Sequence, residues 1–70
     1  MPEPLIVRHP DILGGTPVFA GTRVPADTLA HYLEAGDSIE DFLDDFPSVR
    51  RDQAVRFIEE ASALLVAAAE

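Results

Sequence analysis

Apolar residues recur at helical spacing in three segments of the chain. The spacing i, i+3, i+4 and i+7 occurs in residues 26–33 and again in residues 39–46, and a longer apolar stripe runs through residues 54–68. Pro25 suits the first turn of the first helix, whereas Pro47 stops the second because proline cannot continue a helix. The pattern therefore predicts three amphipathic helices.

Two short apolar runs ahead of the helices predict β-strands. Residues 5–7 are rich in β-branched side chains, and residues 17–20 start with a proline, which a strand tolerates at its first position. The turn-rich connection over residues 10–16 predicts a loose hairpin or an arm. Such a ribbon is marginal alone, so it must lie on the helices or pair with another chain. We expect one mainly α (small α+β) domain, with a β-arm at 1–24 and a homeodomain-like three-helix bundle at 25–70.

Residues 14–25 read Gly-Gly-Thr-Pro-Val-Phe-Ala-Gly-Thr-Arg-Val-Pro. Glycine adopts conformations that other residues resist and proline fixes φ, so the backbone path is strongly constrained here. No Gly-Lys-Ser/Thr follows, which disfavours a phosphate-binding loop. Arg23 stands where the second strand meets the first helix. It either fastens the arm by pairing with a carboxylate or a carbonyl group, or stands exposed as an anchor for a partner.

The second and third helices have the lengths and order of a helix-turn-helix over about residues 38–60. Ser38, followed three residues later by Asp41, is typical of a capping box at the start of this unit. The N-terminal end of the second helix of such a motif reads bases. It carries four candidate DNA-binding residues here: Arg50, Arg51, Gln53 and Arg56.

The same arginines also have a structural interpretation. Arg50 and Arg51 follow two aspartates at the C-terminal end of the second helix, where the helix dipole disfavours anions and a cation would neutralise them. Arg56 lies four residues from Asp52 and four from Glu60, so it can bridge both on a solvated helix face. Both interpretations stay open from the sequence.

The last turns of the third helix are apolar nearly all round. Leu64, Leu65 and Ala68 continue the apolar stripe, while Ala63 and Val66 lie on other faces. A small bundle covers one stripe of a helix and not its whole circumference. We therefore expect this end to be buried against another chain, either a second copy in a homodimer or a partner protein. A frayed, alanine-rich helix end is the alternative.

Composition narrows the classes of function. Thirteen acidic residues against five arginines give a net charge of −8, which opposes nonspecific nucleic-acid binding and suits a basic partner protein. The chain has no cysteine, no metal-ligand set and no nucleophile elbow, so we expect no metal, no cofactor, no small-molecule substrate and no enzymatic activity. A signal peptide and a membrane-spanning run are both absent, so we expect a cytoplasmic location without membrane contact.

The chain resembles the family catalogued as domain of unknown function 433 in three stretches. These are residues 14–25, the sequence Ala-Gly-Asp-Ser-Ile-Glu-Asp-Phe at 35–42, where the first helix ends, and Asp-Phe-Pro at 45–47. The resemblance covers about residues 9–60, and its Gly-Thr-Arg block is the most specific part. By position, the residues that match the family motif are Gly14, Gly15, Pro17, Gly21, Thr22, Arg23 and Pro47.

Members of that family look like VapB-type antitoxins of type II toxin–antitoxin pairs, usually encoded beside a PIN-like ribonuclease toxin. The resemblance implies that the chain masks this toxin and represses the shared operon by binding operator DNA. Arg8 and Arg23 are then candidates to pair with catalytic carboxylates of the toxin, and Leu64, Leu65 and Ala68 are candidates for an apolar partner contact. The alternatives are a stand-alone helix-turn-helix regulator and a protein-interaction module without DNA binding.

Overall fold

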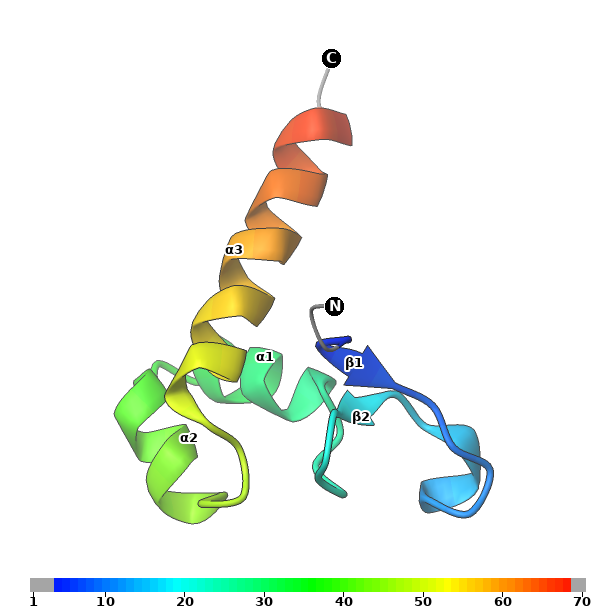
Figure 1. Cartoon of the computed structure of the whole chain (residues 1–70). Helices are drawn as coiled ribbons and strands as arrows, with labels where there is room; N and C mark the ends of the chain where they lie inside the picture. The colour runs from blue at the N-terminus through cyan, green and yellow to red at the C-terminus, as the bar shows by residue number, and fades with distance from the viewer. Residues whose placement is uncertain (1–3, 69–70) are drawn as a thin grey trace.

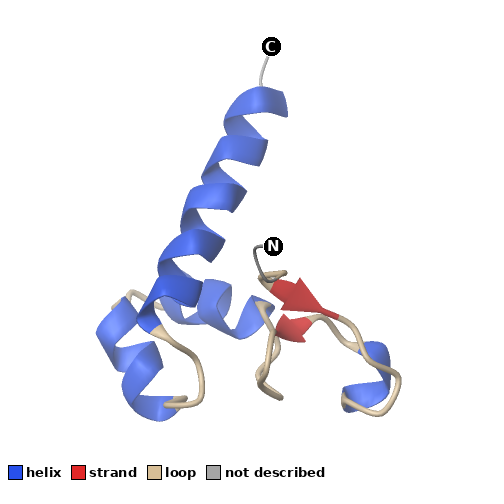
Figure 2. Cartoon of the chain, in the orientation of Figure 1, coloured by secondary structure: helices blue, strands red, loops and turns tan. Residues whose placement is uncertain are grey.

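A computed structural model describes residues 4–68 as a short hairpin followed by three helices (Figures 1 and 2). The elements are β1 (Ile6–Val7), a 3-10 turn (Leu13–Gly15), β2 (Val18–Phe19), α1 (Asp27–Glu34), α2 (Ile39–Asp45) and α3 (Arg51–Ala68). This confirms a mainly α fold with a small β arm. Residues 1–3 of the expected arm and residues 69–70 of the expected bundle lie outside the described residues.

β2 is paired on both of its edges. β1 lies antiparallel along one edge, with Ile6 opposite Phe19. On the other edge the Phe19 amide donates to the Val24 carbonyl at 3.1 Å, and an isolated bridge joins Val18 to Pro25. Val18 and Phe19 are fully buried. The hairpin is therefore part of the core, which supplies the support that a lone two-stranded ribbon lacks.

The helix ends follow local sequence signals. The Ser38 hydroxyl accepts a hydrogen bond from the Asp41 amide, and the Asp41 carboxylate accepts one from the Ser38 amide, both at 3.1 Å. This confirms the predicted capping box at the start of α2. Gly36, with a φ of 87°, follows the last residues of α1, and the exposed Pro47 follows α2. α2 and α3 therefore follow one another through a short connection, the order that a helix-turn-helix requires.

Aromatic rings connect the elements around one core. The ring of Phe19 on β2 lies 6.1 Å from that of Phe42 on α2 and 5.8 Å from that of Phe57 on α3, measured between centroids. Tyr32 on α1 adds an edge-to-face contact with Phe42 at 5.5 Å. Such tilted and edge-to-face pairs are the favoured aromatic arrangements. Buried residues from the hairpin and from all three helices thus form a single hydrophobic cluster.

α3 is longer than the core that it covers. Its first turns carry the buried Ala54, whereas its second half extends away from the other elements (Figure 1). The helix continues to Ala68, and Leu64, Leu65 and Val66 are 74%, 71% and 74% exposed. In the single chain, the apolar end of α3 is therefore formed but uncovered.

Candidate interaction surfaces

The glycine pair lies at the tip of the hairpin. Leu13, Gly14 and Gly15 have positive φ values of 50°, 65° and 92°, so three successive residues follow a left-handed path that only glycine adopts without strain. Thr16 closes this turn by donating its hydroxyl to the Leu13 carbonyl at 2.8 Å. Pro17 then leads into β2. These motif residues shape the backbone ahead of the core.

A second turn, over residues 19–24, is locked by its own hydrogen bonds. The Thr22 amide and hydroxyl both donate to the Phe19 carbonyl, at 3.0 and 2.8 Å, and the same hydroxyl accepts the Val24 amide at 3.1 Å. Gly21 supplies the positive φ, 77°, that the turn requires. Thr22 and Val24 are buried, so the Arg23 side chain between them stands exposed on a fixed backbone.

Arg23 makes no hydrogen bond or ion pair within residues 4–68. Of its two sequence interpretations, internal fastening of the arm is thus not what the structure shows. Arg8, directly after β1, is likewise exposed and unpaired within the described part of the chain. Both guanidinium groups are available to an anionic group of a partner.

Gln53 has a role that differs from the one expected. Its side chain is only 3% exposed; its Oε1 accepts the Arg50 amide at 2.9 Å and its Nε2 donates to the Ala20 carbonyl at 3.0 Å. The expectation that Gln53 contacts a base is wrong for this structure, because its amide is buried and both of its polar atoms are used. Gln53 instead ties the first turn of α3 to the turn that presents Arg23.

The other three candidate DNA-binding residues are paired with carboxylates; Arg50 and Arg51 are exposed and Arg56 is half-buried. The pairs are Arg50 with Asp52 at 3.0 Å, Arg51 with Glu40 at 2.5 Å and Arg56 with Glu60 at 3.2 Å. Of the two expected partners of Arg56, Glu60 is confirmed, whereas Asp52 pairs with Arg50. Arg51 pairs with the beginning of α2 and not with the aspartates at its end. Hydrogen bonds from Arg51 and Arg50 lower the pKa of Glu40 and Asp52, respectively.

The aspartate at the end of α2 has a different partner. The Tyr32 hydroxyl of α1 donates a hydrogen bond to the Asp45 carboxylate at 2.5 Å. This bond raises the pKa of Tyr32, because ionising the hydroxyl would remove the donor and place two negative charges together. The contact joins α1 to α2.

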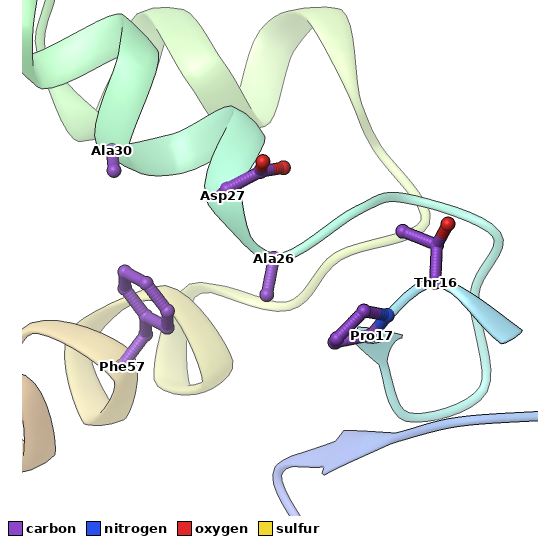
Figure 3. Close-up of a pocket in the computed structure, with 6 residues that line it drawn as sticks. All are labelled: Thr16, Pro17, Ala26, Asp27, Ala30 and Phe57. Carbon is purple, nitrogen blue, oxygen red and sulfur yellow. The ribbon is translucent and has the colours of Figure 1, made fainter.

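Two apolar pockets share Phe57 of α3 as a lining residue. The first, which we call the α1 pocket, has a volume of about 270 Å³ and is lined by Thr16, Pro17, Ala26, Asp27, Ala30 and Phe57 (Figure 3). The second, the β1 pocket, has a volume of about 340 Å³ and is lined by Leu5, Ile6, Phe57, Glu60, Ala61 and Leu64. We call the two together the Phe57 groove. Leu65 and Ala68 lie beyond it, on the exposed end of α3.

Other kinds of site are not found in the described part of the chain. Within residues 4–68 no group of three histidine, cysteine or acidic side chains gathers in a way that would hold a metal ion. None of the helices in these residues is long and apolar enough to cross a membrane. The surfaces with distinctive chemistry among residues 4–68 are thus the arginine-bearing turn and the apolar side of α3.

These features define a small, mainly α domain with a short N-terminal β hairpin. The sequence matches the family described as Protein of unknown function (DUF433) over residues 6–61, and the chain belongs to this family. It is similar to the "Uncharacterized protein y4eO" of Sinorhizobium fredii (strain NBRC 101917 / NGR234), with 49% identity over 45 residues. That alignment covers 64% of this chain and 20% of the relative, so the chain spans about a fifth of that protein's length. No solved structure matches the chain.

Proposed function

We propose that this protein is an antitoxin that neutralises a PIN-like ribonuclease toxin by binding it directly. The observation that carries the proposal is the Phe57 groove, an apolar surface that the described part of the chain leaves uncovered. Exposed apolar surfaces of this kind mark protein–protein contacts. The net charge of −8 favours a basic partner, and a nuclease that holds anionic RNA is basic around its cleft.

We also propose that the end of α3 pairs with a second copy of the chain. Residues 61–68 carry no charged side chain, although the chain as a whole is strongly acidic. A second copy can therefore approach along this segment without bringing like charges together. A two-fold contact uses the same patch on both copies, and a helix end with one continuous apolar stripe fits that requirement.

The antitoxin proposal is tested by expressing the small nuclease encoded beside this gene, alone and together with this protein. We expect growth arrest by the nuclease alone, restored growth on co-expression, and a stable complex that elutes as one species from a sizing column. An inactive nuclease variant with intact folding is the control for arrest by expression load. A neighbouring gene without a nuclease, or no rescue and no complex, would contradict the proposal.

Operator DNA is a second candidate ligand, and it would bind at the N-terminal end of α3, away from the exposed apolar end. Gln53 holds the turn that carries Arg23 against the first turn of α3, so the exposed Arg23, Arg50 and Arg51 belong to one connected region. Exposed ion pairs contribute little stability, so Arg50 and Arg51 can exchange their carboxylate partners for phosphate at small cost. A stand-alone regulator would use the same region.

The DNA proposal predicts that Arg50→Ala with Arg51→Ala weakens binding to the protein's own promoter at least about 30-fold, since each lost arginine contact costs about 1–3 kcal/mol. Fluorescence anisotropy with a labelled promoter fragment measures this, and the salt dependence becomes shallower. Arg8→Ala, an exposed arginine outside this region, is the matched control. Unchanged binding by the double variant would exclude α3 as the recognition element, and no binding by the wild type would favour a protein-interaction module.

A further inference from the structure

We propose that the Phe57 groove is a docking site for a basic amphipathic helix of the partner protein. In this arrangement the helix places one side chain in each pocket, on the two sides of Phe57, and sets a lysine or arginine against Asp27. Helix-in-groove recognition uses apolar side chains at i and i+3 or i+4 in this way. The inference deepens the proposed function, because it names the surface and the chemistry by which the toxin would be held.

Phe57 lines both pockets and is held in place by the core. Its ring is half-buried and packs edge-on against the fully buried Phe19 at 5.8 Å. Side chains at i and i+4 of a helix stand about 5–6 Å apart at their Cβ atoms, so two of them can straddle one ring. Because Phe57 is already ordered by the core, the groove needs little rearrangement to bind.

Small side chains form part of the wall of the α1 pocket. Phe57 of α3 faces Ala30 of α1 and Ala26, which directly precedes α1, across the opening, and Pro17 lies on the far side (Figure 3). The two alanine methyl groups leave room that larger residues would fill. An alkyl chain, such as a leucine or the stem of a lysine or arginine, matches these apolar walls.

The charge at the edge of the α1 pocket identifies the partner as basic. Asp27 is exposed in the first turn of α1, and it makes no hydrogen bond or ion pair within residues 4–68. A lysine or arginine whose stem lies in the pocket can reach such a carboxylate with its charged head. The pocket thus combines an apolar floor with one unneutralised negative charge.

The β1 pocket differs in its electrostatics, which gives the groove a direction. Its acidic residue, Glu60, is already paired with Arg56 at 3.2 Å. Its other lining residues are apolar, including Leu5 of the hairpin and Leu64 of α3. A purely apolar side chain suits this pocket, so the basic residue of the docked helix belongs at the α1 end.

A second copy of this chain is a poor occupant of the groove. The apolar stripe of α3 is bordered by Glu59 and Glu60, and residues 61–68 contain no cation. Docking that helix would add carboxylates beside Asp27 or leave Asp27 without a counter-charge. Charge complementarity therefore assigns the groove to a basic partner, and the end of α3 beyond it to the second copy.

A synthetic peptide tests the groove without the toxin. The probe is an amphipathic helical peptide with leucines at i, i+3 and i+4 and lysines elsewhere; its counterpart has glutamate in place of lysine. With the lysine peptide, the amide NMR signals of the wild-type chain should shift at Ala26, Ala30, Phe57 and Ala61. The glutamate peptide should bind at least about tenfold more weakly than the lysine peptide. Shifts scattered over the acidic surface would overturn the proposal.

Two variants with matched controls sharpen the result. Ala30→Leu fills the α1 pocket and should lower the affinity for the lysine peptide at least about tenfold. Ala67→Leu, on the exposed end of α3, should change this affinity less than about twofold. Asp27→Asn should lower the affinity for the lysine peptide about threefold, and Asp37→Asn should leave it unchanged. Thermal melts by circular dichroism check that all four variants stay folded. Wild-type affinity in Ala30→Leu would overturn the groove.

The same variants separate this inference from the antitoxin proposal. If the toxin binds Ala30→Leu as tightly as it binds the wild type, the groove is not the toxin-binding site, although the antitoxin function stands. If the toxin is not neutralised while the peptide binds in the groove and loses affinity in Ala30→Leu, the antitoxin proposal fails and the groove is supported. If both the peptide and the toxin lose affinity in Ala30→Leu and Asp27→Asn, both are supported.

Discussion

Replacing Gln53 with leucine is expected to lower the free energy of unfolding by about 2–3 kcal/mol. The leucine has a similar size but cannot accept the Arg50 amide or donate to the Ala20 carbonyl, so two partly buried backbone groups lose their partners. A domain of this size has a total stability of only about 4–10 kcal/mol, so the loss is a large fraction of it. Urea denaturation followed by circular dichroism measures the change.

The control places leucine elsewhere on α3. Glu59→Leu changes an exposed side chain that makes no hydrogen bond within residues 4–68, and it should alter stability by no more than about 0.5 kcal/mol. Equal stability of the two variants would contradict the role assigned to Gln53. The turn over residues 19–24 loses its tie to α3 in Gln53→Leu, so any ligand of Arg23 should bind this variant more weakly although Arg23 itself is unchanged.

Gln53 also shows where base-reading expectations from sequence fail. A glutamine near the beginning of a predicted recognition helix fits adenine contact, and that fit led to the wrong expectation. The residue stands three positions after Arg50, where the glutamine of a capping box reaches back to the backbone amide of the residue that precedes the helix. Only half of that local signal was present in the sequence, because Arg50 stands where a capping box has serine or threonine. Its contact with Ala20, 33 residues away, depends on the tertiary fold and had no sequence signal.

The helices were predictable because their signals are local. Apolar spacing, the Ser38–Asp41 capping box and Pro47 each act within a few residues, and they placed α1, α2 and α3 correctly. The hairpin was identified, but the sequence left open whether it lies on the helices or pairs with another chain. Whether a short strand forms a free arm depends on what covers both its edges, and the backbone of residues 24–25 covers the second edge of β2.

The arginines show which surface ion pairs can be predicted from the sequence and which cannot. Sequence spacing identified the Arg56–Glu60 pair because both residues lie on one helix, four positions apart. The pair between Arg51 and Glu40 joins two helices, and its prediction requires the angle between them. The freedom of Arg23 likewise follows from the way Thr22 and Val24 turn inward, which the sequence left open.

Replacing Leu65 with aspartate is expected to convert the proposed dimer into a monomer. Leu65 is 71% exposed on the stripe that continues from the core past Ala61, so the change leaves the folded monomer intact. In a two-fold contact the substitution acts twice, and losing two buried leucines costs about 3–6 kcal/mol, a weakening of about a hundredfold or more. Light scattering over a series of concentrations measures the mass.

Ala63→Asp is the matched control, because it adds the same charge to the same segment on the opposite face of α3. A mass unchanged by Leu65→Asp, or a wild type that stays monomeric at high concentration, would contradict the dimer contact. Leu64 lines the β1 pocket and Leu65 does not, so Leu65→Asp should still bind the lysine peptide and the toxin. If Leu65→Asp abolishes toxin binding together with dimer formation, the end of α3 belongs to the toxin contact. The division of α3 between two partners is then wrong.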